Sequence, residues 1–266
     1  MGSKGLGPPI YSFELPNIFF GITIGFFILT CAKAGQQSFS IFKRKGSFLN
    51  LYVWMVWTLL LTNLFQALLY WLHIRRNERP RLGFLFGSVI LWTLQIQLAL
   101  QIIANRLGLI MANKKRVKHL KVSISVILST LTIAVACVWI PARLTASEKM
   151  LRINAVLDRT GKVIYLLMDL GLNSAFLHIV RHELIARGLT KYKLLFNFNV
   201  CAVVVSLSMD ILIIAMMSLP SDFLYAMFHP VAYGIKLVIE ITMADLIAKI
   251  VRSQHELNSY RTTISA

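Results

Sequence analysis

The sequence predicts an all-α protein that crosses a membrane as a bundle of seven helices, and three observations lead to this fold class. First, 57% of the 266 residues are hydrophobic and only 15% are charged, a composition typical of membrane proteins. Second, seven apolar runs approach or exceed the length of about 20 residues that a helix needs to cross a bilayer. Third, all seven prolines fall in the expected tails, loops and first helical turns, so no span is interrupted.

The apolar runs follow one another closely, and we expect one domain that comprises residues 1–266. The predicted spans are about 18–34, 50–72, 84–107, 120–140, 160–181, 196–218 and 228–251. The connections between them are too short to form a soluble domain. The first span is expected to serve as the targeting signal, without a removable signal peptide. Uninterrupted spans also disfavour a transporter built from broken helices.

Basic residues or prolines close the runs in order along the chain. The first run is followed by Lys43, the second by Arg75, the third by Lys114, the fourth by Pro141, the fifth by Arg187, the sixth by Pro220 and the seventh by Arg252. Trp71 and Trp139 end the second and fourth runs, where interfacial aromatic residues are expected.

Lys and Arg residues predict the orientation of the bundle. They are more numerous in the first, third and fifth connections and after the last run than in the other loops. The positive-inside rule therefore places the N-terminus outside or in the lumen and the C-terminus in the cytosol. The net charge of +17 is explained by this topology signal, so we expect no nucleic acid as a partner. The expected location is a multi-pass position in the endoplasmic reticulum or plasma membrane.

Polar residues inside the spans recur at helical spacing, so each set lies on one face of its helix. The candidate pocket residues are Asn63, Gln66, Gln95, Gln97, Asn173, Tyr233 and Lys236. Their depths along the spans allow them to converge on one polar pocket. The simpler interpretation is interhelical hydrogen bonding, worth about 0.6 kcal/mol for each contact. In that case Lys236 and Glu240 form an i, i+4 ion pair within the last span.

Three acidic residues are the candidate catalytic groups. Asp169 and Asp210 have no cation within one turn of their own helices, and Glu240 lies deep in the last span. A carboxyl group in a low-dielectric pocket can stay protonated at neutral pH and act as an acid. Such an acid suits reactions that protonate an epoxide or alkene and proceed through carbocations, which aromatic rings stabilise. No acidic metal-binding cluster is present, so we expect neither a metal nor another cofactor.

Two known kinds of seven-helix protein fit the sequence poorly. Lys236 has the position of a retinal-binding lysine, but the third span offers glutamines instead of a carboxylate counter-ion. Asn105-Arg106-Leu107 ends the third span where rhodopsin-like receptors carry an acidic-Arg-Tyr triplet, yet the last span has no Asn-Pro-x-x-Tyr motif. A conventional receptor is therefore disfavoured, whereas an unconventional one remains open.

Several motifs nevertheless resemble one family, the seven-helix integral membrane proteins of filamentous fungi. The residues that carry the resemblance are 17–26, 101–111, 138–144, 158–173, 180–200, 206–220 and 228–253, the last reading FHPVAYGIKLVIEITMADLIAKIVRS. The architecture is also similar to that of small fungal terpene cyclases of meroterpenoid and indole-diterpene pathways, which use intramembrane Asp and Glu as a proton source. This similarity implies a metal-free terpenoid cyclase or isomerase of secondary metabolism.

In that hypothesis Asp210 or Asp169 donates the initiating proton and Glu240 is the counterpart base. The expected partners are the lipid bilayer, a lipophilic small molecule and other membrane-bound biosynthetic enzymes. The alternative is a non-enzymatic membrane protein, either a receptor-like sensor of lipophilic signals or an accessory scaffold.

Overall fold

A computed structural model describes residues 11–45, 51–76, 82–111, 113–145, 148–186, 193–217 and 222–264, and within these residues it contains seven α-helices and no strand. The helices are α1 (Tyr11–Lys45), α2 (Leu51–Arg76), α3 (Leu82–Ile110), α4 (Lys114–Thr145), α5 (Glu148–Ala186), α6 (Lys193–Met216) and α7 (Asp222–Ile264). The all-helical fold class predicted from the sequence is confirmed for this part of the chain.

Six of the helices are long and apolar enough to cross a membrane. These segments are Leu15–Lys43, Leu51–Arg76, Leu82–Gly108, Lys114–Ala142, Arg152–His182 and Phe196–Met216. Each helix is longer than the apolar run that predicted it, because helical hydrogen bonding continues into polar residues at the ends of a span. The six segments identify a multi-pass membrane protein. The seventh helix, α7, carries Lys236, Glu240 and Asp245 and is not among the six.

Three prolines lie inside helices: Pro16 in α1, Pro141 in α4 and Pro230 in α7. Pro230 was expected at the start of the last span, but α7 begins at Asp222. The residues before Pro230, which include Phe223, Leu224 and Met227, are mostly apolar and continue the helix toward the N-terminus. Since proline has no N–H group, the helix gives up one backbone hydrogen bond at this point.

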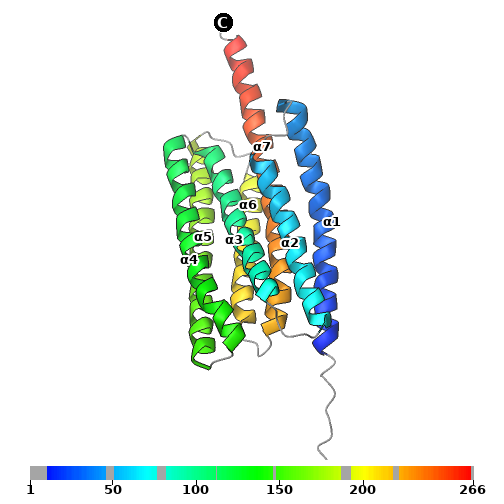
Figure 1. Cartoon of the computed structure of the whole chain (residues 1–266). Helices are drawn as coiled ribbons and strands as arrows, with labels where there is room; N and C mark the ends of the chain where they lie inside the picture. The colour runs from blue at the N-terminus through cyan, green and yellow to red at the C-terminus, as the bar shows by residue number, and fades with distance from the viewer. Residues whose placement is uncertain are drawn as a thin grey trace, which may run out of the picture.

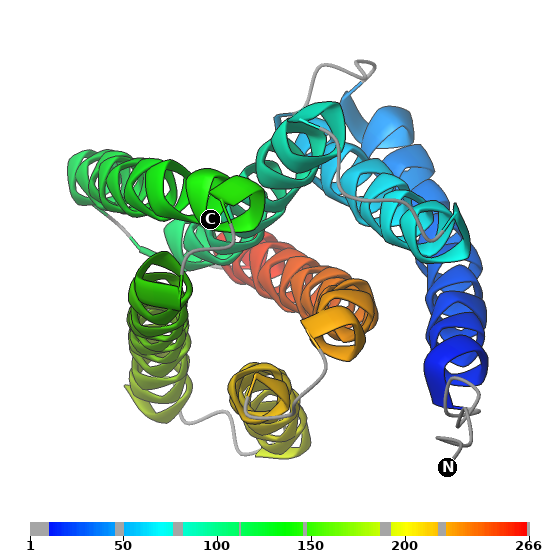
Figure 2. The same ribbon diagram turned by 60° about the horizontal axis from the view of Figure 1, so that its bottom comes forward.

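The helices run side by side along one direction, and the C-terminal part of α7 extends beyond the others (Figure 1). Viewed closer to the bundle axis, α7 lies in the interior between α3 and α6, and α1 and α2 flank it on another side (Figure 2). Consistent with this position, every residue from 227 to 234 is buried. The interior position explains the polar residues of α7, because neighbouring helices surround it.

The apolar residues that point outward lie on the other helices. Examples are Ile28 on α1, Ile133 on α4 and Val204 on α6, each at least 60% exposed. A surface of this kind is stable against lipid chains and not against water. It supports a lipid bilayer as the environment of the bundle.

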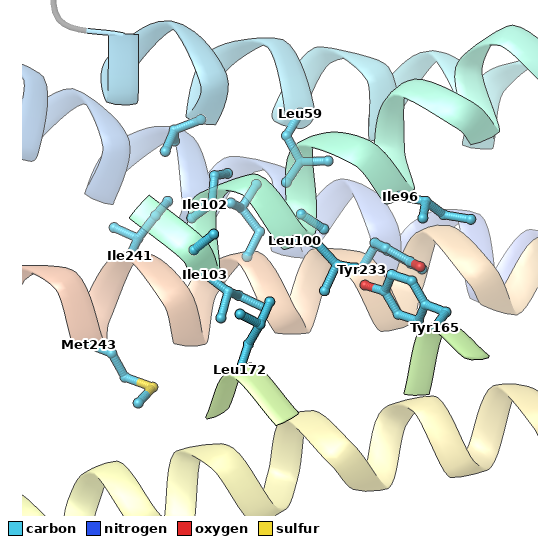
Figure 3. Packing of buried hydrophobic residues seen from close by; sticks show 14 of the residues in the cluster. Leu59, Ile96, Leu100, Ile102, Ile103, Tyr165, Leu172, Tyr233, Ile241 and Met243 are labelled. Carbon is cyan, nitrogen blue, oxygen red and sulfur yellow. The ribbon is translucent and has the colours of Figure 1, made fainter. Parts of the chain in front are cut away.

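The hydrophobic core is centred on α3. Leu100 and Ile103 of this helix are fully enclosed, and they pack with residues of α2, α5 and α7, including Leu59, Leu172 and Ile241 (Figure 3). Within the described residues, α6 packs only against α5 and α7. It is therefore a peripheral helix of the bundle.

Candidate functional site: a buried charge network

Lys236 lies at the centre of a charge network between α5, α6 and α7. Its Nζ atom donates to the two carboxyl oxygens of Asp210 on α6, at 2.7 and 2.6 Å, and to Oδ2 of Asp169 on α5, at 3.1 Å. All three residues are at most 3% exposed. Charges at such depth are tolerated only when they are paired and hydrogen-bonded.

Asn173 and Arg106 extend this network to Glu240. The Asn173 amide donates to Asp169 Oδ1 at 3.1 Å and accepts from Arg106 Nη2 at 2.7 Å. Arg106 Nη1 lies 3.0 Å from Glu240 Oε2. The guanidinium group also lies 4.3 Å from the ring centre of Phe176. We call the six residues Asp210, Lys236, Asp169, Asn173, Arg106 and Glu240 the charge network; it joins α3, α5, α6 and α7.

Regular spacing on two helices brings these groups together. One stripe on α7 consists of Tyr225, His229, Tyr233, Lys236 and Glu240, and one stripe on α5 consists of Asp158, Lys162, Tyr165, Asp169 and Asn173. Steps of three and four residues keep each stripe on one helical face. The backbones of α5 and α7 do not approach within 8 Å between Cα atoms in the described residues. The space between them is filled by the side chains of the two stripes.

The N-terminal parts of the two stripes, on α5 and α7, together form an aromatic region. Lys162 pairs with Asp158 one turn away, and its Nζ lies 4.6 Å from the ring centre of Tyr225. The His229 ring stacks on Tyr233 at 4.5 Å between centroids. Tyr165 and Tyr233 face each other across the gap at 6.1 Å, and both rings are seen in Figure 3. Among the described residues, Nδ1 of the buried His229 has no hydrogen-bond partner.

A small cavity connects this aromatic region to the charge network. Its volume is about 20 Å³, and its lining includes Trp92, Lys162, Tyr165, Asp210, His229 and Tyr233. A cavity needs about 10–15 Å³ of this kind of volume to hold one water molecule. Asp210 is therefore the acid of the network that reaches a space of water size, among aromatic rings.

Two of the predicted pocket residues, Asn63 and Gln95, form a separate amide cluster near α2, and a third, Gln66, lies beside it on α2. Gln95 Nε2 donates to Asn63 Oδ1 at 2.5 Å, and Asn63 Nδ2 donates to the Pro230 carbonyl at 2.9 Å. Gln66 is buried on the same helix as Asn63, and its Oε1 has no hydrogen-bond partner. Gly234 of α7 faces this cluster, and an added Cβ would make ordinary van der Waals contact with Phe26 Cβ at 3.4 Å and Asn63 Nδ2 at 3.5 Å. We call Asn63, Gln95 and the Pro230 carbonyl the amide cluster.

The structure thus divides the residues that the sequence placed in one pocket. Asn173, Lys236 and the acids Asp169, Asp210 and Glu240 come together in the charge network, and Tyr233 lies beside it. Gln97 is elsewhere, because its amide donates to Ser125 on α4. Lys236 and Glu240 also have different partners from the expected i, i+4 pair. Lys236 binds the two aspartates of neighbouring helices, and Glu240 pairs with Arg106.

Arg106 is the site residue that sequence reasoning missed. The sequence indicated it only as the centre of a receptor-like triplet at the end of the third span. It is 1% exposed and is among the largest fully buried side chains of the described residues. Its spacing from Ile102 and Ile103, both buried, would have placed it on the inner face of α3. An arginine on such a face requires a carboxylate partner, which Glu240 supplies.

The described residues contain no group of three or more His, Cys, Asp or Glu side chains arranged to hold a metal ion. The arrangement instead joins ionisable groups to one another, so its chemistry is pairing and proton sharing. In comparisons with known proteins, no family model, no curated protein and no solved structure matches this chain.

Proposed function

We propose that this protein is a non-enzymatic, receptor-like membrane sensor in which the charge network holds the resting arrangement of the helices. One observation carries the proposal: the single ammonium group of Lys236 on α7 binds carboxyl groups from both α5 and α6. Opening of this contact separates buried charges from their partners, which is strongly unfavourable, so the closed arrangement is distinct from an open one. Switching proteins are built on elements with two discrete arrangements.

The moving element in this proposal is α6. It packs only against α5 and α7 among the described helices, and Asp210 is the charged residue that ties it to the interior. Its outer face is apolar, with Val204 and Ile211 exposed. A lipophilic signal that reaches α6 from the bilayer can shift the equilibrium only by binding the open arrangement more tightly than the closed one.

The orientation and location in the proposal follow from the sequence. α7 is the seventh span, the N-terminus faces the outside or the lumen, and the protein resides in the endoplasmic reticulum or the plasma membrane. The interior position of α7 supports a span that is more polar than its six neighbours.

A distance measurement tests the lock directly. Spin labels are placed at Phe198→Cys on α6 and Val122→Cys on α4, two exposed positions, after replacement of Cys31, Cys137 and Cys201 by Ala. Electron paramagnetic resonance then gives the distribution of distances between the labels in bilayers. Lys236→Met is expected to shift or broaden this distribution.

The matched control is Gln101→Leu, which removes a hydrogen bond between α3 and the Lys121 carbonyl away from the network. It is expected to leave the distribution unchanged. Identical distributions in the Lys236→Met and starting proteins would show that the network does not restrain α6, and the sensor proposal would be abandoned.

A second candidate function is the metal-free terpenoid cyclase or isomerase, with Asp210 or Asp169 as the acid and Glu240 as the base. The position of Asp210 in a cavity with Trp92, Tyr165 and Tyr233 supports it. The cavity of about 20 Å³ is far below the ~300–1,000 Å³ of ordinary ligand sites, so this function requires the bundle to open. For that reason it stands second.

Comparing lipophilic metabolites from the source organism with and without the gene tests the enzyme proposal. A cyclase predicts the loss of a product and the accumulation of an isomer of the same mass. It also predicts that Asp210→Asn abolishes the product while the protein still accumulates in membranes. An unchanged metabolite profile would remove the cyclase proposal and leave the sensor proposal intact.

A further inference from the structure

The two aspartates of the charge network are close neighbours. Both bind the same Lys236 Nζ atom, Asp210 at 2.7 and 2.6 Å and Asp169 at 3.1 Å, so the two carboxyl groups converge on one ammonium group. Two carboxylates carry only acceptors, so they cannot form a hydrogen bond between themselves. A hydrogen bond forms when one of the two groups carries a proton.

The charge balance of the network indicates the same state. Its ionisable members are three acids, Asp169, Asp210 and Glu240, and two bases, Arg106 and Lys236. If every group were ionised, the buried network would carry one net negative charge. Because an unpaired charge in a low-dielectric interior is strongly unfavourable, a single proton on the acids makes the network neutral.

A single proton is better accommodated on the aspartates than on Glu240. Glu240 has the guanidinium group of Arg106 at 3.0 Å, whereas the two aspartates share one ammonium group. One cation for two carboxyl groups leaves one charge at that end without a partner. The other charged or titratable groups around Asp210 are Lys162, Tyr165, His229 and Tyr233 at the cavity.

We propose that Asp169 and Asp210 form a proton-binding pair that shares one exchangeable proton beside the ammonium group of Lys236. The cavity at Asp210 gives this proton access to water. It is of a size for one water molecule, and the buried, unpartnered Nδ1 of His229 belongs to its lining. A proton leaves the pair through such a water molecule and is replaced in the same way, and no bond between heavy atoms changes.

Infrared spectroscopy of the full-length protein in bilayers at neutral pH tests the pair. The expected result is a C=O stretching band of a protonated carboxylic acid that shifts when aspartate is labelled with carbon-13 at its side-chain carboxyl group. The band should also shift on transfer to D₂O, because the proton exchanges. Labelling of glutamate should leave it in place.

Two isosteric variants separate a shared proton from a proton on one residue. Asp169→Asn and Asp210→Asn each leave Lys236 with a single carboxylate, so the charges balance without the proton. Each variant is therefore expected to lose the band completely, and Gln101→Leu is expected to retain it. Both variants keep the size and shape of the side chain, and their folding is checked by membrane accumulation and the amide bands.

Three results would overturn the proposal: no such band in the starting protein, a band that responds to glutamate labelling, or a band that survives in either Asn variant. The outcome does not depend on whether the network acts in signalling or catalysis. The proton-binding pair can therefore fail while the restraint of α6 stands, and the reverse also holds.

Discussion

The charge network and the amide cluster are both buried and both tie α7 to its neighbours, yet they differ in what a single change does to them. The amide cluster consists of neutral groups, and each contact between them adds its own small contribution. In the charge network, Lys236 serves two carboxyl groups and Arg106 serves Asn173 and Glu240. Loss of one of the two cations leaves carboxylates unpaired. The comparison shows that burial alone does not determine how much stability is lost when a polar group is removed. The loss depends on how many buried charges the substitution leaves unpaired.

The largest expected effect is that of Lys236→Met. It leaves the two aspartates without a cation, and breaking a buried ion pair in this way costs about 3–5 kcal/mol. The free energy of unfolding in detergent–lipid mixtures is expected to fall by this amount. A loss no greater than that of an amide variant would contradict the distinction between the two regions.

The next comparison is between single and double aspartate variants. Asp169→Asn and Asp210→Asn each leave one carboxylate for Lys236, so each is expected to cost only about 1 kcal/mol, the value of a hydrogen bond. The double variant leaves Lys236 alone and is expected to be as unstable as Lys236→Met. The measurement is the same unfolding titration, and additive losses would refute the shared role of Lys236.

A double-mutant cycle measures the coupling energy between Arg106 and Glu240. Arg106→Met and Glu240→Leu each strand an opposite charge, whereas the two together remove both. The coupling energy between paired groups is typically about 0.5–3 kcal/mol, and here the double variant is expected to be more stable than the sum of the single losses predicts. A coupling energy near zero would mean that the 3.0 Å contact between the two side chains carries no energy.

The smallest effect is expected in the amide cluster. Gln95→Leu removes the bond to Asn63 and is expected to cost about 0.6 kcal/mol, the average for interhelical hydrogen bonds in membranes. Thermal unfolding checks it beside Gln101→Leu. A loss as large as that of Lys236→Met would place the amide cluster among the essential restraints of the bundle.

Much of the fold followed from composition and periodicity. Seven apolar runs predicted seven helices, and the polar stripes on the fifth and last spans predicted inward faces that the structure places opposite each other. These patterns are local, so a single chain shows them. The predicted start of the last span at residue 228 lay six residues too late, because the mostly apolar residues 223–227 continue the helix back to Asp222.

The pairing of the charges could not be predicted in the same way. Lys236 and Glu240 are one turn apart, and this local pattern favoured a pair within the helix. In the structure, their directions toward α5, α6 and α3 decide the partners, and those depend on how the helices pack. The position of Gln97 could not be predicted for the same reason. Its side chain donates to Ser125 on α4 and not to the network, and this depends on how α3 packs against α4. The catalytic role of Asp169, Asp210 and Glu240 stays a prediction.

The interior position of α7 has a consequence for how the protein is made. In the proposed seven-span arrangement, α7 follows the other six helices in the chain and enters the membrane after the helices that carry Asp169 and Asp210. A lysine at the centre of a span opposes insertion by about 2.5–3.5 kcal/mol, and the waiting carboxyl groups offset this. Insertion of α7 and assembly of the bundle are then one event. In that arrangement, a chain that ends before α7 leaves Asp169 and Asp210 without the lysine that pairs with them.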